Sequence, residues 1–117
     1  MADENYGDNR EWVRFVICDF GKGHPKKSAC KSILAAIDSR VGKGICSASA
    51  ETLARDADLS VRTAERCLVT LEQHGIISCV RNRSGRSMRV LRKINPAGII
   101  ADMQARHPEI PLIQWPE

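Results

Sequence analysis

The sequence predicts a mainly α-helical fold with one small β-hairpin, and three observations lead to this prediction. Apolar residues recur every three or four positions over residues 26–41 and again over 60–74, which is the spacing of a helix with one buried face. Ser49 and Ser60 stand just before helical stretches, where a hydroxyl can cap free amides. β-branched residues follow Gly75 and lead into a polar, glycine-containing turn, which is typical of a hairpin.

Size and charge narrow the class of protein. A chain of 117 residues fits one domain with modest tails, and 43% apolar content suits a small core without indicating a membrane span. Residues 1–11 contain four acidic side chains against one arginine, whereas residues 60–93 contain eight basic side chains against two glutamates. Positive charge gathered on one segment is expected of a surface that binds nucleic acid, the alternative being a solvated basic face.

The first part of the chain leaves one alternative open. Residues 1–9 are polar and acidic, so we expect a flexible acidic tail. The apolar residues of 10–20 fit a helical stripe through Trp12 and Phe15, and they also fit a strand in which Phe15 and Ile17 alternate. We predict a helix over 10–20.

A longer helix is predicted over 26–41. Gly42 closes it, and residues 44–46 are expected to add a very short third strand to the hairpin sheet. One face of this helix is apolar, with Ala29, Ile33, Leu34, Ile37 and Val41. That face would form the scaffold against which the next two helices pack.

Two helices joined by a tight connection are predicted next. Ser49 caps the first, residues 58–59 connect them, and Ser60 caps the second, which ends near His74 before a left-handed Gly75. The stripe of the second helix expected to face the core comprises Val61, Ala64, Leu68 and Leu71. Its remaining surface comprises Arg62, Thr63, Arg66, Val69, Thr70 and Gln73.

A basic hairpin follows the second helix. Strands are predicted over 76–80 and 87–91, with the polar residues 81–86 between them as the loop. The hairpin carries Arg81, Arg83, Arg86, Arg89 and Arg92. So many like charges on a short ribbon repel one another unless water separates them or a polyanion neutralises them.

The segment SAETLARDADLSVRTAERCLVTLEQHGII and the basic hairpin after it resemble winged helix-turn-helix DNA-binding proteins of bacterial phages, plasmids and mobile elements, some of which initiate replication. The resemblance covers roughly residues 10–92, favours the helix at 10–20 and implies a winged helix-turn-helix domain over residues 10–93. It implies that residues 81–86 form a wing and that Val61 and Glu65 replace residues that are often polar or basic. It further implies that the major groove is faced by Ser60, Arg62, Thr63 and Arg66.

The function expected from these features is sequence-specific binding of double-stranded DNA. The recognition helix 60–74 would enter the major groove, and the wing 81–86 would lie on the adjacent backbone or minor groove. The candidate DNA-binding residues are Ser60, Arg62, Thr63, Arg66, Thr70, Arg81, Arg83 and Arg86. Such a protein would act as a transcriptional regulator or a mobile-element replication factor. The alternative is a winged-helix protein-interaction module within a larger complex.

Other classes of function find no support in the sequence. No phosphate-binding glycine loop, carboxylate pair or nucleophile arrangement is recognisable, so we expect neither an enzyme, nor a cofactor, nor a small-molecule effector. The five cysteines are widely spaced, which predicts reduced thiols in the cytoplasm and no metal site.

Residues 94–117 are predicted to form a short helix and a proline-rich apolar tail. Asn95 and Pro96 give a helix start signal, and the helix would end near Arg106. The apolar residues of this region have no evident partner within the chain; they are Ile99, Ile100, Met103, Ile110, Leu112 and Trp115. We therefore predict a homodimer through residues 95–115, which would place two recognition helices on a palindrome.

Overall fold

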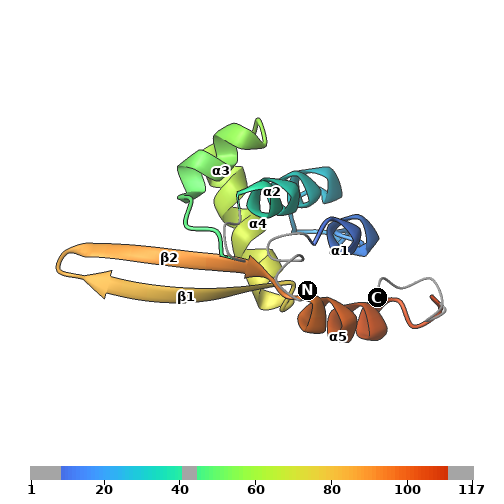
Figure 1. The fold of residues 1–117 in the computed structure, drawn as a ribbon. Helices are drawn as coiled ribbons and strands as arrows, with labels where there is room; N and C mark the ends of the chain where they lie inside the picture. The colour runs from blue at the N-terminus through green and yellow to red at the C-terminus, as the bar shows by residue number, and fades with distance from the viewer. Residues whose placement is uncertain (1–8, 41–44, 111–117) are drawn as a thin grey trace.

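The computed structural model describes residues 9–40 and 45–110, which form five helices and one two-stranded antiparallel sheet (Figure 1). The architecture is mixed α/β, with a body of helices from which the β-hairpin projects (Figure 1). In chain order the elements are α1 Arg10–Phe15, α2 Lys27–Ser39, α3 Ala50–Asp56, α4 Val61–Gln73, β1 Ile77–Ser84, β2 Ser87–Ile94 and α5 Pro96–Arg106.

Helix α1 is shorter than predicted. It ends at Phe15, and Val16 is extended with φ −65° and ψ 134°, so a helix over the whole of 10–20 is wrong beyond residue 15. Val16 and Cys18 are then buried at alternate positions. The ammonium of Lys31 explains the early end, because it donates to the carbonyl oxygens of Val13 and Arg14, the latter at 2.8 Å.

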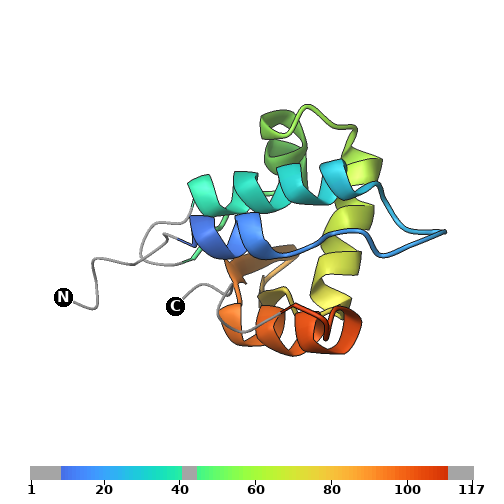
Figure 2. The ribbon, with the colours of Figure 1, turned by 90° about the vertical axis from the view of Figure 1, so that its right-hand side faces the viewer.

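Helix α2 is the centre of the body. The predicted helix is confirmed over residues 27–39, and its expected apolar face is buried, whereas residues 41–44 lie outside the described chain. Figure 2 shows α1 beside α2, with α4 running from the region of α3 toward α5. The fully buried side chains in this core include Ile33, Leu34, Ile37, Leu53, Leu71, Ile99 and Met103.

The connection between α3 and α4 is set by local hydrogen bonds. Ser49 and Ser60 are the predicted caps, and Ser60 accepts from the amide of Thr63 at 3.1 Å. Asp58 follows the end of α3 in the left-handed region, with φ 57°. The amide of Leu59 then reaches back to the carbonyl oxygen of Ala54 at 2.9 Å, which closes the helix by the Schellman pattern.

Helix α4 ends in the same way. Gly75 has φ 74°, as predicted, and the amide of Ile76 donates to the carbonyl oxygen of Leu71 at 3.0 Å. The side-chain amide of Asn95 donates to the Gly75 carbonyl oxygen at 3.2 Å. A Cβ at Gly98 would overlap that same oxygen, so α5 crosses the end of α4 at a point where only glycine fits.

The hairpin is longer than predicted. Its strands pair from Ile77 with Ile94 out to Ser84 with Ser87, so residues 81–84 belong to a strand and only Gly85 and Arg86 form the turn. The polarity of 81–86 misled the prediction of a loop, because side chains on a projecting ribbon are solvated on both faces. Gly85 has φ 61° at the first turn position, as a type II′ turn requires.

The third strand is reduced to one bridge. Cys46 pairs with Arg92 through two backbone hydrogen bonds of 2.7 and 2.9 Å. The prediction for residues 44–46 is therefore confirmed at Cys46, while Gly44 is outside the described residues.

Helix α5 is part of the same core. The predicted helix is confirmed over 96–106, but Ile99 and Met103 are fully buried within the chain, which corrects the expectation that they lack an internal partner. Asp102 is also buried, and it contacts His74 at 2.8 Å and the guanidinium of Arg106 at 2.9 Å. Leu112 and Trp115 lie outside the described residues.

Candidate nucleic-acid interface

One face of α4 is exposed along the whole helix. Arg62, Arg66, Val69 and Gln73 follow one another at spacings of four, three and four residues, so they form a single stripe opposite the core. Val69 is 54% exposed in the middle of this stripe. The stripe therefore presents two cations, one amide and one apolar side chain to solvent.

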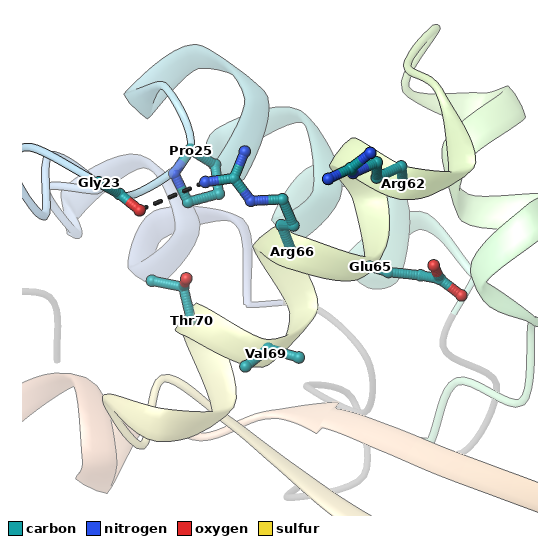
Figure 3. Close-up of a pocket in the computed structure, with 7 residues that line it drawn as sticks. All are labelled: Gly23, Pro25, Arg62, Glu65, Arg66, Val69 and Thr70. Carbon is teal, nitrogen blue, oxygen red and sulfur yellow. Dashed lines mark hydrogen bonds between the residues drawn. The ribbon is translucent and has the colours of Figure 1, made fainter.

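The two arginines of the stripe are differently placed. Within the described part of the chain, Arg62 makes no hydrogen bond or ion pair. Arg66 donates to the carbonyl oxygen of Gly23 at 3.3 Å, and its guanidinium lies beside Pro25 (Figure 3). A single long bond to a neutral acceptor on the surface contributes little, so Arg66 can exchange it for a stronger anionic partner.

A shallow hollow of about 290 Å³ separates the stripe from the segment that precedes α2. It is lined by Gly23, Pro25, Arg62, Glu65, Arg66, Val69 and Thr70 (Figure 3). Thr70 was expected to face DNA, but it is only 5% exposed, because this segment covers its side of α4. Thr70 is thus removed from the exposed surface.

Ser60 and Thr63 are occupied by the start of α4. The Ser60 hydroxyl donates to the Thr63 hydroxyl oxygen at 2.9 Å and accepts from the Thr63 amide. The Ser60 and Thr63 side chains therefore stabilise the amino-terminal turn of α4, and a contact with a ligand would be made in addition to these hydrogen bonds. Val61 was expected in the core but is 41% exposed, because at the first position of α4 it lies on the edge of the apolar stripe; Cys67 is buried in the core instead.

The hairpin carries cations on both faces. Residues paired across an antiparallel ladder share a face, so Arg83 lies with Met88 on one face and Arg89 with Asn82 on the other. Arg86 occupies the turn. Arg83, Arg86 and Arg89 are all exposed, and none has an ion pair among residues 9–40 and 45–110.

Arg81 has a different position from the other hairpin arginines. It lies at the base of the hairpin, where its guanidinium donates to both carboxylate oxygens of Glu72 at 2.7 and 2.9 Å. This bond holds the pKa of Glu72 below its ordinary value. Arg81 was expected in the loop of the hairpin; it instead joins β1 to the last turn of α4.

A groove of about 320 Å³ runs between α4 and the hairpin. Its charged lining comprises Glu65, Glu72, Arg81 and Arg92, and the guanidinium of Arg92 also donates to the carbonyl oxygen of Ala48 at 3.1 Å. Sequence reasoning missed the pairing of Glu72 with Arg81. No local signal indicates it, because the pairing depends on the direction in which the hairpin leaves α4.

Comparison with known proteins gave no match to a protein-family model, a curated protein or a solved structure. In the described ranges, no three histidine, cysteine or carboxylate side chains come together as metal ligands would. None of the helices described here has the length and apolarity needed to cross a membrane.

Proposed function

We propose that the protein binds double-stranded DNA sequence-specifically as a winged helix-turn-helix, with α3 and α4 as the helix pair and the hairpin as the wing. The observation that carries the proposal is the exposed stripe of α4, in which Arg62, Arg66 and Val69 stand free of the core beside a projecting basic hairpin. An α-helix fits the major groove, and its exposed side chains can then reach base edges.

The dimensions of the stripe suit such a contact. Gln73 lies eleven positions after Arg62, and at a rise of about 1.5 Å per residue this distance is roughly 16 Å, or about five base pairs along one groove. Arginine recognises guanine through two parallel hydrogen bonds, and an exposed apolar side chain such as Val69 suits the methyl group of thymine.

The wing would supply attraction that does not depend on sequence. Arg83, Arg86 and Arg89 project beyond the helical body and are free to meet phosphates or a narrow minor groove. Arg81 and Glu72 support the proposal indirectly, because their bidentate contact joins the base of the wing to α4.

The test of the reading helix is binding to duplexes selected from a random pool. Arg62→Ala and Arg66→Ala should each lose about 1–3 kcal/mol on the selected site if the arginine makes a bidentate base contact. Arg14→Ala is the matched control. Arg14 is exposed on α1, and its replacement removes the same charge away from α4. Unchanged affinity and site preference in both α4 variants would move the reading surface elsewhere.

The wing is tested by the salt dependence of binding. Changing Arg83 and Arg86 to Gln should weaken binding to all duplexes and make the salt slope shallower by about 0.9 for each phosphate that the variant no longer neutralises. If specific binding collapses while the slope stays the same, the wing reads bases. If the parent protein is not retained on heparin or bulk DNA at moderate salt, the alternative of a protein-interaction module takes precedence.

Stoichiometry distinguishes one copy from two. One recognition helix and one wing cover about half of a usual site, so we propose two copies on a palindrome, acting in transcriptional regulation or in replication of a mobile element. A selected site without symmetry, with a monomer mass for free and bound protein, would contradict the dimer. Because Ile99 and Met103 are in the core, these two side chains would not contribute to the contact between the two copies.

A further inference from the structure

The exposed surface of α4 contains one acidic side chain among its cations. Glu65 lies three residues after Arg62 and four before Val69, and it is exposed. It makes no ion pair with any described residue, although Arg62 and Arg66 are close to it in the helix. In Figure 3 its carboxylate points away from both guanidinium groups.

Glu65 stands at the boundary of the two hollows that flank α4. It lines the hollow beside Gly23 and also the groove beside the hairpin. Glu72, the other carboxylate of the groove, is neutralised by Arg81, so Glu65 is the acidic group on this surface that keeps its acceptor atoms free within the described chain. A helix lying in a groove with this face inward would take that free carboxylate to the bases.

A buried carboxylate needs a donor, because its desolvation is otherwise costly. Phosphates offer none and repel it, while the major groove offers two amino groups, N4 of cytosine and N6 of adenine. The N6 amino group of adenine stands next to the acceptor N7, which repels a group that can only accept. The N4 amino group of cytosine has an acceptor on one side only, the O6 of its paired guanine, and the C5–H edge on the other, whereas N6 of adenine lies between N7 and the O4 of thymine. A carboxylate therefore meets less repulsion at cytosine.

We propose that Glu65 determines specificity by accepting a hydrogen bond from the N4 amino group of a cytosine in the major groove. This inference rests on the proposed function and adds the base that one residue selects. Arg62 and Arg66 then supply attraction on the same face, and Glu65 restricts where that attraction can be used.

The experiment compares the parent, Glu65→Gln and Glu65→Ala on duplexes selected from a random pool, followed by single-pair variants of the best site. Glutamine has nearly the helix propensity of glutamate, so the fold should be kept, which circular dichroism verifies. Glu11→Gln is the matched control. Glu11 is exposed on α1, and its replacement removes the same charge away from α4.

For the parent and for Glu11→Gln, replacing the selected cytosine should weaken binding by about five- to tenfold, the low end of a good base contact. Glu65→Gln should shift the preference at that position to adenine, which glutamine recognises through N6 and N7, and Glu65→Ala should lose the preference. If both variants bind every duplex more tightly with the parent's base preferences, Glu65 only moderates phosphate attraction and the inference is overturned. If the parent binds no duplex, the proposed function falls, and this inference falls with it.

Discussion

Gly98 is the residue at which α5 comes closest to the end of α4, and Gly98→Ala tests whether that contact holds the two helices together. A Cβ at this position would overlap the carbonyl oxygen of Gly75 and would lie 2.7 Å from the Gly75 carbonyl carbon and 2.6 Å from Nδ2 of Asn95. Two carbon atoms pack at about 3.5–4.0 Å, so α5 would have to move by roughly 1 Å. The obstacle is backbone, which cannot rotate away as a side chain can.

The expected loss follows from what that movement breaks. Asn95 would lose its 3.2 Å hydrogen bond to Gly75, at about 1 kcal/mol, and the packing around the fully buried Ile99 and Met103 would loosen, at about 1–3 kcal/mol. Alanine favours a helix interior over glycine by about 1 kcal/mol, which offsets part of this loss. We therefore expect a net destabilisation of about 2 kcal/mol and a melting temperature lower by about 10 °C.

Thermal unfolding followed by circular dichroism measures this change, with Ala101→Gly as the comparison. Ala101 is exposed in the same helix, so its replacement reports helix propensity alone and should cost about 1 kcal/mol. If propensity governed both positions, Gly98→Ala would raise the melting temperature. A value equal to or above the parent's would refute the close approach of the two helices.

Three further predictions concern neighbouring parts of the fold. Gly75→Val should lower the melting temperature, because valine is strained at φ 74°, whereas Gly75→Asn should lose less; equal losses would contradict that backbone assignment. Because Arg81 lowers the pKa of Glu72, the stability that this pair gives is present above the ordinary glutamate pKa of about 4.3 and is lost as the pH falls through the lowered pKa. The melting temperatures of the parent and Glu72→Gln should accordingly differ at pH 7, and the difference should shrink as the pH falls through that lowered pKa; a difference that does not change on acidification would argue against the pair. A thiol reagent should label only Cys79 readily in the native protein and all five cysteines in denaturant, since the other four thiols are at most 1% exposed; rapid labelling of a second thiol would contradict that burial.

Burial also keeps one of the four buried thiols, that of Cys18, protonated. Burial raises the pKa of the Cys18 thiol to about 11, so it stays protonated at neutral pH and acts as a small apolar side chain. The sequence predicted reduced thiols from spacing alone, but it could not tell that Cys79 is the partly exposed one. That distinction depends on which face of β1 meets the helical body.

The candidate site could be predicted only in part. The spacing of Arg62, Arg66 and Val69 on one side of α4 follows from the helical period, so the exposed stripe was visible in the sequence. The burial of Thr70 was not, because a segment more than forty residues earlier in the chain covers that side of the helix. The role of Arg81 was also hidden, since its partner Glu72 lies on a different element.

The sequence by itself determined the start of α3 and both ends of α4, whereas the end of α1 was set by Lys31 of another helix. Ser49 and Ser60 cap α3 and α4, and Gly75 closes α4, because each of these interactions is made with backbone groups only a few residues away. Tertiary structure alone decided the length of the strands, the angle of the hairpin and the docking of α5 at Gly98. Those features depend on contacts between residues that are distant in the chain. Packing of the whole core brings these residues together, so no local sequence pattern predicts the contacts.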